Sequence, residues 1–153
     1  MRLSLETRLQ CPLEQAIAEV KTPRLLEYVA HPMVTFQPIE PASFPEIWFE
    51  GTFWVKLLLF GVLPFGRQAI VISYPAGEDT FTLRDNGYSA LIKTWDHRIT
   101  LEKMGGGIRY RDELRISAGI LTPVIWLFAC VFFKHRQRRC NALAKAGFNY
   151  SAP

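Results

Sequence analysis

One stretch decides the fold, AGILTPVIWLFACVFFKHRQRRCNALAKAG at residues 118–147. It is typical of one long helix, because Thr122 can cap the helix by accepting a backbone N–H bond and Pro123 suits its first turn. Gly147 marks the end of that helix. At 100° per residue one face carries the apolar stripe that a core-facing helix needs. The stripe consists of Ile125, Ala129, Phe132, Phe133, Cys140 and Leu143. Arg136 lies in the middle of this stripe.

Everything before this helix is typical of a sheet that the helix could cover. Residues 2–10 alternate between apolar and polar side chains, which indicates a half-buried strand. Two short helices follow, from Pro12 to Lys21 and from Thr22 to about Ala30. Turn signals then separate six further strands: Met33–Ile39, Ile47–Phe60, Arg67–Tyr74, Thr80–Arg84, Ala90–Met104 and Gly107–Ser117.

The short connections between these strands, including a turn predicted at residues 85–87, favour antiparallel pairing. We therefore predict an α+β fold in which a curved seven-stranded antiparallel sheet wraps around the C-terminal helix. At 153 residues and 49% hydrophobic content, the chain can form a single domain over residues 1–153 with a sizeable core.

Charge and cysteine content narrow the function classes. The 18 basic residues exceed the 14 acidic ones by four, and Lys134, Arg136, Arg138 and Arg139 account for the excess. Such a local run is more often a solvated helix face, and no recognition motif accompanies it, so we expect no nucleic-acid partner. An odd number of cysteines without CxxC spacing, and no signal-peptide pattern before the first strand, favour a reduced, cytoplasmic protein.

The uncharged run from Ile116 to Phe133 is borderline for a membrane span. Its helical part, from Pro123 to Phe133, covers only about 16 Å against a hydrocarbon core of about 30 Å. We therefore do not expect it to cross a membrane.

Several segments resemble the START-like (SRPBCC) superfamily, whose Bet v 1-type helix-grip fold occurs in polyketide cyclases and lipid-transfer proteins. They are WFEG at 48–51, FGVLPFG at 60–66, WDHRI at 95–99, YRDE at 110–113, AGILT at 118–122 and HRQRR at 135–139. The resemblance covers essentially the whole chain. It implies a curved antiparallel sheet that grips the C-terminal helix around an apolar cavity, and a lipid- or polyketide-like ligand there, without implying one activity.

Three polar residues are predicted to point into this interior. Strand alternation places Asp112 and His97 on the inward faces of neighbouring strands, and the helix contributes Arg136. Because an isolated buried charge costs several kcal/mol, Asp112 and Arg136 are expected to be partners. They could form a structural ion pair with His97 as a core residue, or they could be the polar end of a ligand cavity. In the second case the predicted walls are Phe49, Phe53, Trp95, Tyr110 and Phe133.

The cyclase relatives suggest a catalytic alternative, in which His97 is a general base oriented by Asp112 for proton abstraction beside a carbonyl. We expect no metal, because His31 and His135 lack metal-ligand spacing, and no cofactor, because no HExxH, GxGxxG, P-loop or GxSxG motif occurs. Three function classes remain: a binder of an apolar or amphipathic small molecule, a cofactorless cyclase or dehydratase, and a ligand-free interaction or membrane-surface module.

The outer side of the long helix begins apolar, with Val124, Leu127 and Val131 ahead of Lys134 and Arg138. The loop at residues 57–65 is also richer in apolar side chains than alternation needs. Three outcomes are open: the loop covers the helix, two copies form a homodimer through the patch, or the patch contacts an anionic membrane surface.

Overall fold

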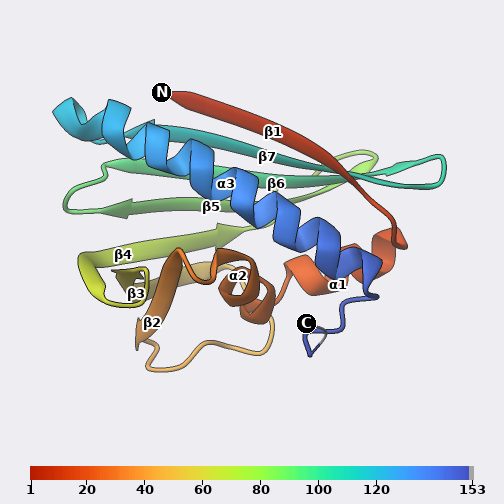
Figure 1. Cartoon of the computed structure of the whole chain (residues 1–153), viewed down its shortest axis with the longest axis horizontal. Coiled ribbons are helices and arrows are strands. Elements are labelled where there is room, and N and C mark those ends of the chain that lie inside the picture. The colour runs from red at the N-terminus through yellow and green to blue at the C-terminus, as the bar shows by residue number, and fades with distance from the viewer. Residues whose placement is uncertain (152–153) are drawn as a thin grey trace.

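The computed structural model describes residues 1–151 and shows a curved sheet with one long helix across its concave face (Figure 1). The elements are β1 (Arg2–Leu9), α1 (Leu13–Val20), α2 (Pro23–Ala30), β2 (Val34–Glu40), β3 (Gly51–Leu59), β4 (Leu63–Ser73), β5 (Thr80–Ser89), β6 (Thr94–Met104), β7 (Gly107–Ser117), the 3₁₀ turn η1 (Gly119–Leu121) and α3 (Thr122–Lys145). The seven strands pair antiparallel in the order β1-β7-β6-β5-β4-β3-β2. The predicted fold class is confirmed.

The sheet order explains where the two short helices lie. Strands β2 to β7 follow one another as neighbours, and β1 returns to pair with β7 at the far edge. The connection from β1 to β2 therefore has to cross from one edge strand to the other, and α1 and α2 are that crossing. They cover one end of the concave face beside α3 (Figure 1).

The predicted apolar stripe of α3 is confirmed, since all six of its members are buried. The predicted cap differs. Thr122 is the first helical residue, and its hydroxyl accepts the N–H of Ala118 at 2.9 Å and donates to the carbonyl of Gly119 at 2.7 Å. It therefore closes the preceding η1 turn and does not cap α3. At the other end Gly147 adopts a φ of 64° and stops the helix as predicted.

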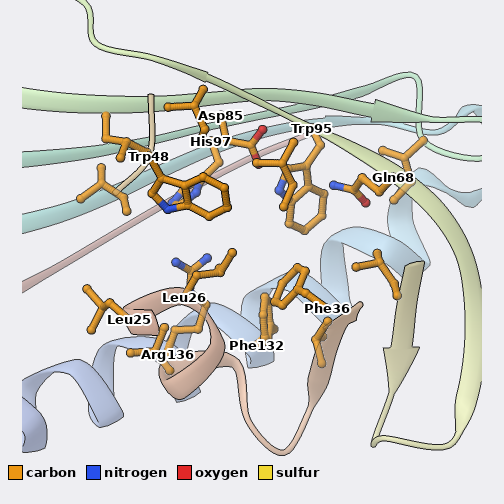
Figure 2. A pocket seen from close by; sticks show the side chains of 18 of the residues that line it. Leu25, Leu26, Phe36, Trp48, Gln68, Asp85, Trp95, His97, Phe132 and Arg136 are labelled. Atoms are coloured by element: carbon orange, nitrogen blue, oxygen red, sulfur yellow. The ribbon is translucent and has the colours of Figure 1, made fainter. Parts of the chain in front are cut away.

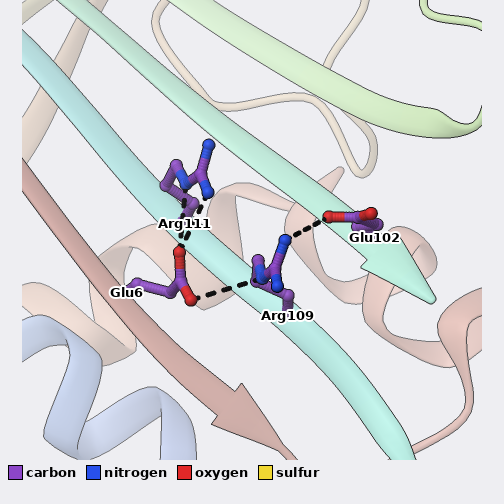
Figure 3. A network of polar contacts seen from close by, with 4 residues as sticks. All are labelled: Glu6, Glu102, Arg109 and Arg111. Carbon is purple, nitrogen blue, oxygen red and sulfur yellow. Dashed lines mark hydrogen bonds and ion pairs between the residues drawn. The ribbon is translucent and has the colours of Figure 1, made fainter. Parts of the chain in front are cut away.

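The two faces of the sheet differ in chemistry. On β7 the predicted alternation is confirmed, because Ile108, Tyr110, Asp112, Leu114 and Ile116 are all buried. The opposite face carries an ion-pair network in which Arg109 contacts Glu6 at 3.3 Å and Glu102 at 2.8 Å, and Arg111 contacts Glu6 at 3.0 Å (Figure 3). Such solvent-facing pairs contribute little to stability. They identify the convex face as the side in contact with water.

The turn predicted at residues 85–87 is wrong. Strand β5 continues to Ser89 and stays paired with β6 as far as Gly87 opposite Trp95. The turn lies at residues 90–93, where Ser89 donates its backbone N–H to the carbonyl of Ile92 at 2.7 Å. Leu91 is exposed in this turn, and Ile92 is buried. Asp85 therefore lies in the middle of strand β5 and not in a surface loop.

Candidate functional site

A cavity of about 270 Å³ lies between the concave face of the sheet, α2 and α3. Helix α3 packs closely on β1, β7 and α2, so the space over the middle strands is left unfilled. Most of the lining is aliphatic or aromatic, and the aromatic members are Phe36, Trp48, Phe65, Trp95, Phe128, Phe132 and Tyr110. Val124 lines the cavity and is also 69% exposed, so the cavity opens to solvent beside the first turn of α3.

Apart from the hydroxyls of Thr22 and Tyr110, four polar side chains line this otherwise apolar space, and we refer to Gln68, Asp85, His97 and Arg136 as the polar arc. The first three come from the adjacent strands β4, β5 and β6. Arg136 comes from α3, on the opposite side. Figure 2 shows its guanidinium reaching from the helix toward the sheet, with Asp85 and His97 on the sheet side and the Gln68 amide extending toward Trp95. The arc is therefore built across the two layers that enclose the cavity.

Asp85 is held by a gap in the sheet. Between β4 and β5, Ala69 pairs with Tyr88 and Ile72 with Asp85, while the two intervening pairs are missing from the ladder. In this gap the backbone N–H of Val71 donates to Oδ1 of Asp85 at 2.8 Å, so the carboxyl takes the place of a backbone acceptor. Burial raises the pKa of Asp85 to about 7, against the opposing effects of the Val71 bond and the Arg136 charge.

Gly87 forms the other side of the same gap. A Cβ at this position would lie 2.6 Å from the carbonyl oxygen of Ala69 and 3.1 Å from Oδ1 of Asp85. A side chain therefore cannot be placed there without moving backbone. Asp85 and Gly87 are therefore required in strand β5 by their contacts with the neighbouring strand β4.

His97 and Asp112 form a buried pair beneath the cavity. Nε2 of His97 lies 2.8 Å from Oδ1 of Asp112, and the amide of Gln137 donates to Oδ2 at 2.9 Å. The hydroxyl of Tyr110 is a more distant donor at 3.5 Å. Burial lowers the pKa of His97, although the hydrogen bond to Asp112 opposes this shift. Because Asp112 accepts from its neighbours, we assign the imidazole as neutral with its proton on Nε2, which leaves a lone pair on Nδ1.

The predicted ion pair between Asp112 and Arg136 is wrong. Among residues 1–151, Arg136 lies within ion-pair distance of no carboxylate, and its buried Nε has no hydrogen-bond partner. Its Cζ instead lies 4.8 Å from the ring centre of Phe133 and 5.6 Å from that of Phe132. Gln137, the next residue along the helix, occupies the position on Asp112 that we had predicted for Arg136.

The predicted site residues divide into two groups. Trp95, His97, Tyr110 and Arg136 line the cavity. Four others do not: Asp112 and Phe133 are fully buried behind the wall, Phe53 is buried against Trp48, and Phe49 is 58% exposed outside.

Sequence reasoning missed Gln68 and Asp85. Alternation with Ile70 and Ile72 could have placed Gln68 on the inward face of β4. Asp85 was hidden by the turn signal of its neighbours Asn86 and Gly87.

Of the three outcomes left open for the outer face of α3, cover by the loop at residues 57–65 is contradicted. Val124, Leu127 and Val131 are each more than half exposed, as are Phe60, Val62 and Leu63 in the connection between β3 and β4. The loop therefore leaves this helix face open, and the homodimer and membrane alternatives remain.

Two other features bear on partners. The helical segment Gly119–Lys145 is long and apolar enough, by length and composition, to span a membrane, although its inner stripe is part of the core. Within the described part of the chain, no group of three or more His, Cys, Asp or Glu side chains could hold a metal ion.

Solved structures of other proteins share this fold at low sequence identity. A protein from Nitrosomonas europaea is 15% identical, with 96% of each chain covered and a TM-score of 0.67. A hypothetical protein from Helicobacter pylori is 10% identical over 94% of this chain and 88% of that chain, with a TM-score of 0.68. A START superfamily protein from Mycobacterium smegmatis is 10% identical over 95% of this chain and 97% of that chain, with a TM-score of 0.62.

These neighbours, together with the strand order and the C-terminal helix, show that the chain has the helix-grip fold of the START-like superfamily. No curated protein matches the chain. Residues 9–143 match the family model described as Domain of unknown function (DUF8410), and the chain therefore belongs to that family.

Proposed function

We propose that the protein binds an apolar or amphipathic small molecule, lipid- or polyketide-like, in the cavity between the sheet and α3. The observation that carries this proposal is the cavity itself, which combines about 270 Å³ of space, apolar walls and an opening at Val124 with few polar groups. Small-molecule sites in proteins have this construction.

A ligand-free interaction module fits the cavity less well. Side chains that face an unfilled space lose packing contacts, so a space of about 270 Å³ costs stability relative to a filled core. A module that acts only through its surface would gain stability from a filled core. A binder needs the space.

Ligand-dependent stabilisation tests the proposal, because a molecule that binds only the folded state raises its stability. The protein is titrated with 1-decanol and decanoate, and binding is followed by the melting temperature and by the fluorescence of Trp48 and Trp95, which line the cavity. Leu26→Trp, on the α2 wall, is expected to fill the cavity and abolish both responses.

Val131→Trp is the matched control, since it adds the same side chain on the exposed outer face of α3. It should leave both responses unchanged. Undiminished binding by a folded Leu26→Trp variant would place the ligand elsewhere and contradict the proposal.

The His97–Asp112 pair favours a second candidate, a cofactorless cyclase- or dehydratase-like enzyme. A neutral imidazole that lines the cavity and is oriented by a buried carboxyl at 2.8 Å has the arrangement of a general base. Deuterium exchange of the α-protons of 2-decanone, followed by NMR in D₂O, tests it. The enzyme hypothesis expects accelerated exchange that is lost in His97→Gln, and a rate equal to that of buffer alone rejects it for this class of substrate.

A further inference from the structure

Building on the proposed binding function, we propose that the ligand carries a carboxylate head. The head is bound by the two terminal nitrogens of Arg136, and the apolar tail runs along α3 toward the opening at Val124. Both residues line the cavity. They are 12 positions apart on one helix, which is about 18 Å at 1.5 Å per residue, so the cavity is long enough in this direction for a head and a tail.

Arg136 is buried in the wall of the cavity. Its side chain is 7% exposed, and its buried Nε has no hydrogen-bond partner. The rings of Phe132 and Phe133 face its guanidinium, and they provide a cation–π contact but no acceptor for its N–H groups. A guanidinium is always charged, so the fold holds a buried cation whose donors are unused.

Among residues 1–151, no carboxylate lies within ion-pair distance of Arg136. Asp112 already accepts from His97 and Gln137. Asp85 is fixed by the backbone N–H of Val71 at 2.8 Å, and no ion pair joins it to Arg136 within the described residues. Burial raises the pKa of Asp85 and the Arg136 charge lowers it, but neither carboxyl lies within ion-pair distance of the guanidinium. The guanidinium can therefore accept an anion from a ligand.

The terminal nitrogens of Arg136 determine which head group fits. Because Nε is buried, Nη1 and Nη2 are the nitrogens that can face a ligand, and their parallel N–H groups match the two oxygens of a carboxylate. On the sheet side, the side-chain amide of Gln68 lines the same cavity and can donate to the same head. A neutral head would fill the space and leave the cation uncompensated.

Head-group exchange at constant tail length tests the inference. Affinities for decanoate, 1-decanol, decylammonium and decyl phosphate are measured by calorimetry at one pH and salt concentration. Decanoate is expected to bind at least tenfold more tightly than 1-decanol, and decylammonium more weakly than either. In Arg136→Gln the tenfold preference for decanoate over 1-decanol should disappear.

Arg138→Gln is the matched control, because this exposed arginine lies two residues further along the same helix. It should keep the preference for decanoate. If Arg136→Gln does not fold, Arg136→Lys retains the charge without the two parallel donors and should reduce the preference.

The other outcomes are distinguishable. Equal binding of decanoate and 1-decanol overturns the carboxylate head and leaves the proposed function standing. Tighter binding of decyl phosphate than decanoate also overturns the carboxylate. A preference that survives in Arg136→Gln and in Arg136→Lys removes Arg136 from the site. If none of the four probes binds, the proposed function itself fails for decyl chains.

Discussion

Asp85→Asn should make the protein more stable at neutral pH and leave it unchanged in acid. The carboxyl has a pKa of about 7 in the folded protein against an ordinary value of 3.8, chiefly because it is buried. A group whose pKa is raised by folding contributes its stability below the unfolded value and loses it as the pH rises toward the folded value. The loss therefore develops between about pH 4 and pH 7. Roughly three pKa units at 1.36 kcal/mol each set an upper limit of about 4 kcal/mol, because Asp85 is half-buried and contact with water reduces the effect.

Asparagine retains the acceptor for the backbone N–H of Val71 but carries no charge. In urea unfolding from pH 4 to pH 8, the free energy of unfolding of the variant should exceed that of the wild-type protein by an amount that grows with pH to at most about 4 kcal/mol. The hydrogen bond from the backbone N–H of Val71 is preserved, so we expect no loss of stability from the pairing of β4 and β5.

Asp96→Asn on the neighbouring strand is the control with the opposite sign. The hydrogen bond from Arg84 lowers the pKa of Asp96, so this carboxylate stabilises the fold above its unfolded pKa and loses that contribution in acid. Its replacement should reduce stability at pH 8 and have little effect near pH 2. An Asp85→Asn difference that is independent of pH, or smaller than about 1 kcal/mol at pH 8, would show that the Asp85 carboxyl is solvated.

Three other substitutions test the remaining features. Arg136→Met should raise the free energy of unfolding in urea by about 1 to 3 kcal/mol, because it replaces an unpaired buried cation by an apolar side chain of similar size. A lower free energy of unfolding would mean that the guanidinium has a partner. Asp112→Ala should lower it by about 2 to 5 kcal/mol, because buried donors on His97 and Gln137 lose their acceptor, and unchanged stability would contradict their burial. Leu127→Lys should change the free energy of unfolding by less than about 0.5 kcal/mol. It should weaken self-association, measured by light scattering, or binding to anionic vesicles at low salt. An unfolded variant would mean that Leu127 is buried.

Periodic patterns predicted the scaffold well because they extend over many residues. The α3 stripe recurs over five turns and the β7 alternation over eleven residues, so chance matches are few. The Asp-Asn-Gly signal failed because it is local. Asp85 is in the strand because its carboxyl replaces a backbone acceptor for Val71, and Gly87 is there because a Cβ would collide with the carbonyl of Ala69. Neither reason can be read from three residues.

The partner of Asp112 could not be predicted for a different reason. Arg136 and Gln137 are adjacent on α3 and both are buried, although their side chains leave the helix about 100° apart. Which of them meets β7 depends on the rotation and lateral position of α3 on the sheet. The sequence pattern predicts which side of a helix is buried only to within about 100°. It therefore cannot decide which of two adjacent buried residues makes a given contact. Gln137 meets Asp112, and Arg136 is directed over the middle strands.

The two largest predicted gains in stability, at Asp85 and Arg136, come from removing the charges that face the cavity from opposite layers. An ion pair between them would relieve both penalties at once, and the bond from Val71 to Asp85 is part of what keeps them apart. The fold thus retains a carboxyl that is partly protonated near pH 7 and a cation without a partner, where apolar side chains would pack more stably. Groups with perturbed pKa values and unused donors concentrate where proteins bind ligands or catalyse reactions, at a cost in stability. The polar arc is therefore a stronger candidate for the functional end of the cavity than the His97–Asp112 pair alone, because the hydrogen bonds of that pair also stabilise the core.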